Sequence, residues 1–378
     1  MSVFPWLSLL LGALYFSYGV YVPFWGLWLS SRQVTPEQIG LLMGLGMAVR
    51  LAGNYLVLGR MSSVTRLIPT CRTLALASLL CFGLFYFCHG FWPLLLLMVV
   101  ANIIYPTQLP LSDVLASNMV RQVGLDYGKV RLWGSAAFIA GSTLVGIVSQ
   151  RYGIDWALGI MLLGLIALLC IAWTPMTPQP VELVASAARC RMRDLLRQRG
   201  FRRLLLVASL LQGSHAAYYS FSAIYWRSQG YSESLIGLLW ALGVLAEIVM
   251  FALSRRFLGR VSSQPLLIIG AVGCLVRWAV LGSTVALPLV IAAQLLHAVT
   301  FCITHLATVR YMTHMMAQNE LIPAQTLYSS ISAGVVMALL TTLVGHLYPS
   351  LGSGIFWLMM LLALPALLLR LPATTPAQ

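Results

Sequence analysis

Charged residues are scarce in this sequence: only 8% of its 378 residues are Asp, Glu, Lys or Arg, whereas 60% are hydrophobic. A soluble domain carries about 25% charged residues. With a mean hydropathy of +0.89, the chain has too few polar side chains to cover a surface in water. These proportions exclude an ordinary soluble domain and predict a protein embedded in a lipid bilayer.

Lysine is almost absent, and so is any arrangement of basic residues that suits nucleic acid. Of the 23 basic residues, only Lys129 is a lysine. A nucleic-acid surface gathers its basic side chains on one face of a soluble domain, and this composition provides no such domain. Despite the net charge of +14, we therefore expect no nucleic-acid partner.

Motifs for metal, redox or catalytic chemistry are missing as well. The seven cysteines form no CxxC or Cys/His ligand spacing. Most of them lie in apolar stretches, where cysteine behaves as a small hydrophobic residue. The chain contains no HExxH, GxSxG or paired-Asp motif. The sequence therefore predicts no metal and no cofactor, and it argues against a membrane enzyme.

Long apolar runs are abundant instead. A transmembrane helix needs about 20 apolar residues, and twelve segments meet this requirement. The first of them is longer than the apolar region of a signal peptide, which has about 7–15 residues, so we interpret it as a span. The predicted spans are residues 4–29, 38–59, 72–90, 94–117, 131–149, 155–173, 203–226, 234–254, 265–284, 286–309, 324–346 and 352–370.

The arginines favour one side of these spans. If the N-terminus is cytoplasmic, eighteen basic residues fall in cytoplasmic segments, whereas only Arg32, Arg151 and Arg227 fall on the opposite side. Arg50 and Arg277 lie inside spans. Cytoplasmic loops of membrane proteins carry an excess of Lys and Arg. The distribution predicts a multi-pass protein with both termini in the cytoplasm.

The longest loop, about residues 175–202, divides the spans into two sets of six. It begins with three prolines and becomes arginine-rich from Arg189. We interpret it as a cytoplasmic linker whose amphipathic part lies on the anionic inner leaflet. The sequence thus predicts an N-terminal six-helix bundle over residues 1–174 and a C-terminal six-helix bundle over residues 203–378.

The two halves resemble each other in sequence. Residues 39–46 and 236–243 share the pattern Ile-Gly-Leu-Leu followed by Leu-Gly, and the same offset sets Arg50 against Glu247. Internal repeats are typical of secondary transporters, whose substrate sites lie near the bilayer midplane between the repeats. The predicted fold class is an all-α membrane protein of twelve transmembrane helices in two pseudo-symmetric six-helix bundles.

Ionisable side chains inside the spans are candidates for function, because each costs about 2.5–3.5 kcal/mol to insert. Glu247 and Arg277 carry opposite charges on neighbouring spans, and they either only neutralise each other or also exchange a proton. A guanidinium stays charged in proteins, so Glu247 is the better proton carrier. His297 lies on a polar stripe and can relay or gate the proton. His215 and His305 fit either such a relay or a buried structural role.

A second group of residues is predicted to contact the substrate. Arg50 either binds an anion or bonds backbone carbonyls. Asp113 follows two prolines, so it either lines a polar cavity or satisfies the backbone of a broken helix. Tyr18 and Tyr21 in the first span and Tyr218 in the seventh can stack on a flat substrate, although stripes of aromatic residues usually pack against one another.

Several segments resemble one known family. The stretch Leu125–Ser135, LDYGKVRLWGS, resembles the start of span five in the oligosaccharide/proton symporter-like branch of the major facilitator superfamily. Phe16–Gly19 (FSYG), Leu211–Tyr219 (LQGSHAAYY) and Phe221–Trp226 (FSAIYW) resemble the 3-phenylpropionate (phenylpropionic acid) permeases of that branch. The resemblance runs over essentially the whole chain. It implies a proton-coupled transporter of the bacterial inner membrane.

The lactose permease, a more distant relative, is similar at single positions. Its sugar-binding acid and arginine match Asp113 and Arg131, and its functional arginine and histidine match Arg277 and His297, at the same separations. Its proton-carrying glutamate is a threonine here. Together with its position inside a span opposite Arg277, this departure leads us to infer that Glu247 has taken over proton carriage.

Together these observations predict a symporter that imports 3-phenylpropionate or a related aromatic carboxylate by alternating access, with the proton as coupling ion. Arg131 or Arg50 is expected to hold the carboxylate, because a planar guanidinium binds it bidentately. The other predicted substrate contacts are Asp113, Tyr18, Tyr21, Phe138 and Tyr218, and the predicted proton-coupling residues are Glu247, Arg277 and His297.

The alternative is a proton-coupled sugar or nucleoside symporter of the same superfamily, since Asp113 with Arg131 matches a hydroxyl-binding pair. In either case we expect the chain to act as a monomer in the bilayer.

Overall fold

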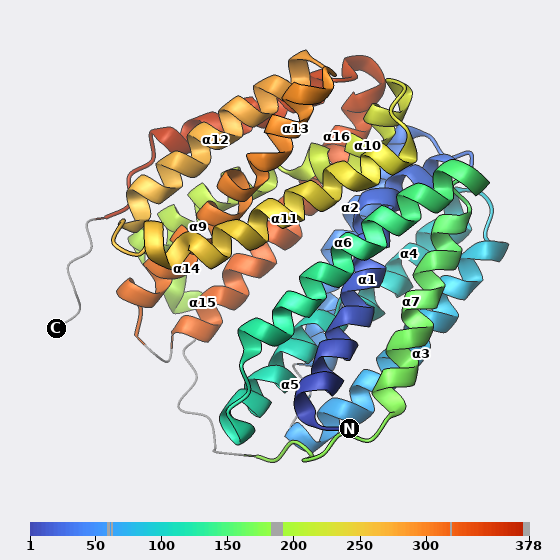
Figure 1. Cartoon of the computed structure of the whole chain (residues 1–378). Helices are drawn as coiled ribbons and strands as arrows, with labels where there is room; N and C mark the ends of the chain where they lie inside the picture. Colours follow the sequence, from blue (N-terminus) through green and yellow to red (C-terminus); the bar gives the residue numbers. More distant parts are fainter. Residues whose placement is uncertain (59–60, 62, 183–191, 318–319, 373–378) are drawn as a thin grey trace. The chain divides into compact units, whose positions relative to one another are not determined.

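The computed structural model describes residues 1–58, 61, 63–182, 192–317 and 320–372. Helices account for most of this described chain (Figure 1). Arg60, Arg189 and Arg191, which contribute to the predicted cytoplasmic charge, lie outside the described residues, as does the middle of the predicted linker.

Ten segments of the described chain are long and apolar enough to cross a membrane. They are Val3–Ser30, Pro36–Val57, Val64–Phe87, Phe91–Val123, Tyr127–Tyr152, Trp156–Trp173, Glu233–Ser254, Ser263–Ser283, Leu287–Met315 and Pro323–Leu351. The predicted span 203–226 is divided by a turn at Ser214 and His215, and the predicted span 352–370 contains a shorter apolar helix, Gly354–Leu367. The all-α membrane fold is confirmed, whereas the count of twelve spans is confirmed only in part.

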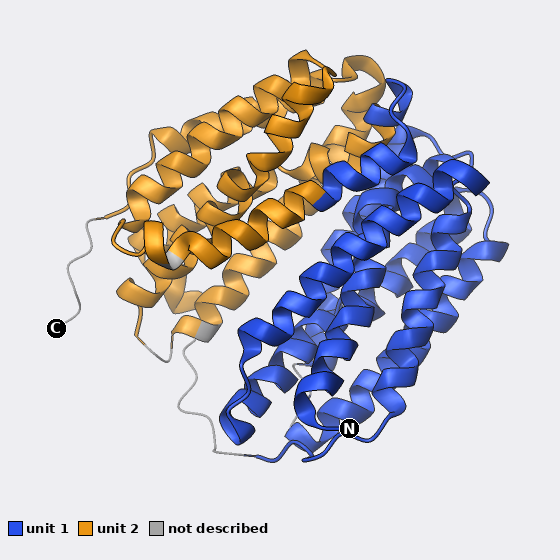
Figure 2. Cartoon of the chain, viewed as in Figure 1, with its two compact units in different colours: residues 1–185, 226–241 blue, residues 186–225, 242–378 orange. Residues whose placement is uncertain are grey.

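Tertiary contacts divide the chain into two compact units (Figure 2). Unit 1 contains residues 1–185 and 226–241, and unit 2 contains residues 186–225 and 242–378. The division into bundles over residues 1–174 and 203–378, with a linker between them, stays a prediction.

Unit 1 is organised around its first helix. Helix α1 packs against α6 and α7, while α2 packs on α4, and α3 packs on both α4 and α7 (Figure 1). The helices of this unit are α1 (Val3–Ser30), α2 (Pro36–Val57), α3 (Leu67–Leu84), α4 (Phe91–Ile104), α5 (Gln108–Val123), α6 (Tyr127–Tyr152) and α7 (Trp156–Trp173).

The contact between α1 and α6 depends on two glycines. A Cβ atom at Gly19 would collide with the carbonyl oxygen of Phe138, and one at Gly141 would collide with the carbonyl oxygen of Phe16. Lipid tails are as apolar as the side chains, so helices in a bilayer associate through close packing at small residues rather than through the hydrophobic effect. This packing fixes Phe138 beside the part of α1 that carries Tyr18.

Helix α6 begins earlier than the predicted span 131–149. The side chain of Asp126 accepts a hydrogen bond from the backbone N–H of Lys129 at 3.3 Å. Aspartate is a favoured N-cap because its carboxylate satisfies a free N–H of the first turn. Arg131 therefore lies inside the second turn of α6 rather than at the start of the helix.

Unit 2 is organised around α12, which packs against α13, α14 and α17. The unit contains α10 as far as Tyr225 and α11 from Leu242 onwards. Its helices are α8 (Met192–Leu195), α9 (Arg199–Gly213), α10 (Ala216–Ser228), α11 (Glu233–Phe257), α12 (Ser263–Ser283), α13 (Leu287–Leu295), α14 (Thr304–Met315), α15 (Leu321–Tyr328), α16 (Met337–Leu351) and α17 (Gly354–Ala363).

Several helices of unit 2 are irregular in the middle of their spans. A π-helical segment, Ala298–Ile303, joins α13 to α14, and a second one, Ser329–Val336, joins α15 to α16. Such π-helical turns are rare and occur frequently at functional sites. His297 directly precedes the first of them, and His215 lies in the turn between α9 and α10. The irregular backbone thus coincides with two of the buried histidines.

Candidate functional site

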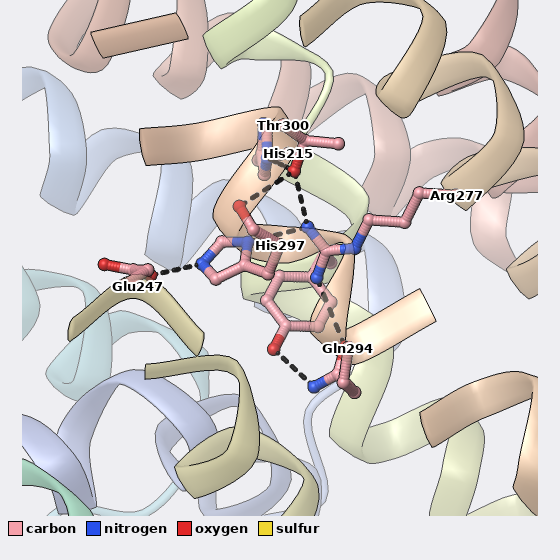
Figure 3. Close-up of polar contacts among 7 residues, drawn as sticks. His215, Glu247, Arg277, Gln294, His297 and Thr300 are labelled. Atoms are coloured by element: carbon pink, nitrogen blue, oxygen red, sulfur yellow. Dashed lines mark hydrogen bonds and ion pairs between the residues drawn. The ribbon is translucent and has the colours of Figure 1, made fainter. Parts of the chain in front are cut away.

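Three ionisable residues of unit 2 form a continuous chain of contacts. His297 lies between Glu247 of α11 and Arg277 of α12 (Figure 3). Its Nε2 atom is 2.7 Å from Oε1 of Glu247, and its Nδ1 atom is 2.7 Å from Nη1 of Arg277. Arg277 is fully buried, and the side chain of Glu247 retains 19% exposure. The structure therefore brings the three predicted proton-coupling residues together, with the imidazole in the middle.

The contacts of His297 determine where its proton lies. A guanidinium can only donate hydrogen bonds, so Nδ1 of His297 must accept from Arg277 and carries no hydrogen. In the neutral ring the hydrogen therefore lies on Nε2, which donates it to the Glu247 carboxylate. Protonating Nδ1 would break the bond from Arg277 and place a second cation beside the guanidinium. The geometry favours a neutral imidazole held between a cation and a carboxylate.

Arg277 is fixed by neutral partners as well. It donates to Oγ1 of Thr300 at 3.1 Å and to Oε1 of Gln294 at 3.2 Å. Its Cζ atom lies 4.4 Å from the centre of the Tyr218 ring, a cation–π contact. Gln294 in turn donates to the Tyr218 hydroxyl at 2.8 Å (Figure 3). Tyr218, which the sequence placed among the substrate contacts, thus helps to hold the buried guanidinium.

His215 belongs to the same network, although the sequence left its role open. Its Nδ1 atom is 3.0 Å from the carbonyl oxygen of Leu211, and its Nε2 atom is 3.0 Å from Oγ1 of Thr300. A carbonyl only accepts, so Nδ1 carries the hydrogen and Nε2 accepts from the threonine hydroxyl. Thr300 Oγ1 therefore accepts from Arg277, and its one hydrogen is shared between Nε2 of His215 at 3.0 Å and the backbone carbonyl oxygen of His297 at 3.3 Å. Sequence reasoning did not predict the link between Thr300 and His215. The available signals were the polar stripe of His297, which includes Thr300, and the Gly213-Ser214 interruption of the apolar run that contains His215.

A third histidine of unit 2, the half-buried His305, is positioned by stacking. The rings of His297, Phe301 and His305 form a column with centroid distances of 5.5 and 6.4 Å. Nδ1 of His305 lies 3.3 Å from the hydroxyl of Tyr328. Phe301 has no group that exchanges a proton, so the column orients the two imidazoles without offering a proton path through the phenyl ring.

In unit 1, Arg50 is bonded to a neutral side chain. Its Nε atom donates to Oδ1 of Asn102 at 3.2 Å, and the Tyr21 hydroxyl donates to the same oxygen at 3.2 Å. Nδ2 of Asn102 donates to the Met98 carbonyl at 2.9 Å, which fixes the orientation of the amide. Asn102 was not among the predicted site residues. It holds Arg50 and Tyr21 in place without neutralising the guanidinium charge.

Tyr18 lies in the same unit with an unused polar group. Its ring stacks on Tyr105 with a centroid distance of 4.7 Å and an interplanar angle of 19°, and Tyr21 meets Tyr105 edge-on at 5.8 Å. Among the described residues, the buried Tyr18 hydroxyl has no hydrogen-bond partner. A buried polar group without a partner costs about 1–3 kcal/mol. The hydroxyl is therefore a point at which a bound ligand can form a hydrogen bond.

Arg131 and Asp113, which the resemblance matches to a hydroxyl-binding pair, each contact a tyrosine. The Cζ atom of Arg131 lies 4.0 Å from the centre of the Tyr15 ring. Asp113 is exposed and accepts a hydrogen bond from the hydroxyl of Tyr127. No ion pair joins Asp113 to Arg131 within the described chain. Phe138 is half-buried farther along α6. Sequence reasoning missed Tyr15 and Tyr127 as partners of these two charges.

Comparison with known proteins identifies the family. Residues 6–359 match the family described as MFS_1 like. The chain belongs to this major facilitator family. It is 42% identical over 376 residues to the probable 3-phenylpropionic acid transporter of Escherichia coli strain K12, with 98% of each chain covered. It is 26% identical over 348 residues to the maltose permease of Geobacillus stearothermophilus, with 92% of this chain and 87% of that one covered.

Solved structures share the fold at low sequence identity. A point mutant of the nucleoside transporter NupG superposes with a TM-score of 0.80 at 14% identity, covering 96% of this chain and 98% of its own. A bacterial homologue of the human lysosomal transporter Spinster superposes with a TM-score of 0.65 at 14% identity, covering 97% and 94%. The predicted major facilitator fold is therefore confirmed. The protein is a multi-pass membrane transporter of this family and not an enzyme.

Proposed function

We propose that the protein is a proton symporter that imports 3-phenylpropionate or a related aromatic carboxylate by alternating access. The observation that carries this proposal is the 42% identity over nearly the whole chain to the E. coli transporter, which is named for 3-phenylpropionic acid. In this proposal the protein is a monomer in the bacterial inner membrane. Its termini lie in the cytoplasm, as the arginine distribution predicts.

The substrate half of the proposal rests on two cations of unit 1. A carboxyl group with an ordinary pKa near 4 is ionised at pH 7, so its binding in a membrane protein requires positive charge. Neither Arg50 nor Arg131 forms an ion pair within the described chain, and each lies beside tyrosine rings or a neutral amide. A guanidinium with free N–H groups can receive a carboxylate bidentately. The Tyr18 hydroxyl, which has no partner in the described part of the chain, adds a donor close to these aromatic rings.

The proton half of the proposal rests on the network of unit 2. His297 donates from Nε2 and accepts at Nδ1, so it has no free nitrogen for an incoming proton. Arg277 is charged already. Glu247 is the remaining acidic group of the network and is more exposed than its two partners. We therefore assign proton binding to Glu247, with His297 and Arg277 as the groups that orient and stabilise its ionised form.

Protonation of Glu247 gives the network two states. The ionised carboxylate receives the hydrogen bond from His297 Nε2, and the cation of Arg277 stabilises this charge through the imidazole. When Glu247 becomes neutral, that attraction weakens and the charge of Arg277 is no longer balanced nearby. A ligand shifts a conformational equilibrium only when it interacts differently with the two states. Protonation of Glu247 changes the electrostatic balance of the network and can therefore shift the alternating-access equilibrium.

The proposal is tested by uptake of labelled 3-phenylpropionate into vesicles that contain the purified protein. We expect accumulation when the outside is acidic and loss of accumulation when a protonophore is added. Accumulation that the protonophore leaves unchanged would contradict proton coupling. Absence of uptake, together with absence of binding of 3-phenylpropionate to the purified protein, would contradict the substrate assignment.

A second candidate keeps the mechanism and changes the substrate to a sugar or nucleoside. The identity of 26% to a maltose permease supports it. Competition separates the two candidates: unlabelled aromatic acids should reduce uptake of 3-phenylpropionate, whereas maltose and uridine should not. Competition by the neutral compounds, with none by aromatic acids, would favour the second candidate.

A further inference from the structure

An exposed stripe at the start of α9 changes from basic to apolar within two helical turns. Arg199, Arg202, Arg203 and Leu206 follow the spacing i, i+3, i+4 and i+7, which places them on one face of the helix. All four are exposed, and together they line a surface cavity of about 420 Å³. The cavity therefore combines three guanidinium groups with one apolar side chain.

The three guanidinium groups of this stripe have no counter-ion within the described chain. None of them takes part in an ion pair there. Arg203 donates a hydrogen bond to the carbonyl oxygen of Arg370 at 3.3 Å, which leaves its charge in place. Like charges at i, i+3 and i+4 on a helix repel one another. An anion shared by the three side chains relieves this repulsion, and a phosphate group suits a guanidinium because it can be bound bidentately.

The apolar end of the stripe distinguishes a lipid from a free anion. Leu206 is 49% exposed next to the arginines, whereas Phe201 and Leu204 on the other side of the helix are buried. From the predicted span 203–226 we expect the arginines at headgroup level and Leu206 at the edge of the hydrocarbon. An inorganic phosphate ion needs only the cations. A phospholipid uses both the cations and the apolar surface beside them.

We propose that Arg199, Arg202 and Arg203 bind the phosphate of an anionic phospholipid whose acyl chain runs along Leu206. This site has no part in the substrate or proton contacts of the transport proposal. The sequence predicts that the arginine-rich part of residues 175–202 contacts the membrane. The proposal places this contact on one face of α9 and assigns it to the phosphate of a lipid headgroup.

Native mass spectrometry of the detergent-solubilised full chain tests the proposal, with phosphatidylglycerol and phosphatidylcholine as probes. We expect a preference for phosphatidylglycerol that the triple variant R199Q/R202Q/R203Q weakens roughly 100-fold, because each basic residue near anionic lipid contributes about five-fold. The control R66Q/R256Q/R260Q removes the same number of exposed charges elsewhere and should keep the preference. Equal losses of phosphatidylglycerol binding in both triple variants would show that the lipid responds to the overall positive charge rather than to this site. That result, or the absence of a preference for phosphatidylglycerol in the wild type, would overturn the proposal.

A second pair of measurements separates a lipid from a free phosphate ion. Inorganic phosphate at millimolar concentration should not displace bound phosphatidylglycerol, and Leu206→Gln should weaken phosphatidylglycerol binding although it leaves all three arginines in place. Because Leu206 is exposed, the substitution changes no buried packing. Displacement by phosphate, or full lipid binding in Leu206→Gln, would identify a simple anion site and contradict the assignment to a lipid.

Discussion

Thr300 is the smallest group in the buried network of unit 2, and its removal should be costly. Its hydroxyl oxygen accepts from Arg277 at 3.1 Å and lies 3.0 Å from Nε2 of His215. The substitution Thr300→Val keeps the shape of the side chain and deletes the group that serves both partners. Arg277 and His215 are fully buried, so water cannot easily replace the lost contacts.

The expected destabilisation follows from the two hydrogen bonds. A bond from a charged donor is worth about 1.5–3 kcal/mol and a neutral bond about 0.5–1.5 kcal/mol. Thr300→Val should therefore lower the free energy of unfolding by about 2–4.5 kcal/mol, the sum of these two ranges. It should also reduce proton-coupled uptake, because Arg277 loses one of the partners that orient it toward His297.

The matched control lies on the same predicted span. Thr308 is equally buried, and within the described residues its hydroxyl donates only to the backbone carbonyl of Thr304, at 2.8 Å. That carbonyl belongs to helical backbone, so Thr308→Val should cost less than about 1 kcal/mol. Unfolding of the two purified variants by SDS in mixed micelles measures the difference. Equal stabilities for the two variants would refute the reasoning that Thr300 links Arg277 to His215.

Further predictions concern unit 1. Tyr18→Phe removes a buried hydroxyl that has no partner among the described residues, so the free energy of unfolding should not fall. The Kd for 3-phenylpropionate should rise about three- to ten-fold through loss of a hydrogen bond to the substrate, and unchanged binding with unchanged stability would exclude that contact. Gly19→Ala should destabilise the protein by about 1–3 kcal/mol or more, because the added methyl group meets a backbone carbonyl of α6. The control Gly12→Ala should be tolerated, since the nearest atom to a methyl group there is 3.9 Å away. Thermal unfolding of the two variants measures the difference. Arg131→Lys and Arg50→Lys keep the charge and lose the planar fork. In direct binding assays, the substitution at the arginine that holds the carboxylate should weaken the binding of 3-phenylpropionate about ten-fold, and wild-type affinity in both variants would contradict a guanidinium ligand.

Hydropathy and charge predicted the large features because they are properties of single segments. Apolar length predicts spans, and the family resemblance predicted the fold that the comparisons confirm. The same reasoning places Glu247, Arg277 and His297 on neighbouring spans. It does not place the imidazole between the two charges, since that depends on the rotation of three helices about their axes.

The remaining details depend on tertiary contacts. The π-helical segment after His297 follows a stretch without proline or glycine, so no local residue signals it. Asp113 and Arg131 have the spacing of a hydroxyl-binding pair, yet each meets a tyrosine instead. The role of Asn102 as the partner of Arg50 emerges only from the packing of α2 on α4.

The central claim is that Glu247 carries the proton that accompanies the substrate. The most direct test records the external pH when 3-phenylpropionate is added to de-energised vesicles that contain the protein, with protein-free vesicles as the blank for passive entry of the acid. The wild type and Glu37→Gln, which changes an exposed carboxylate at the start of α2, should make the medium more alkaline. Glu247→Gln should bind and exchange substrate without alkalinisation. Alkalinisation by Glu247→Gln equal to that of the wild type would contradict the account.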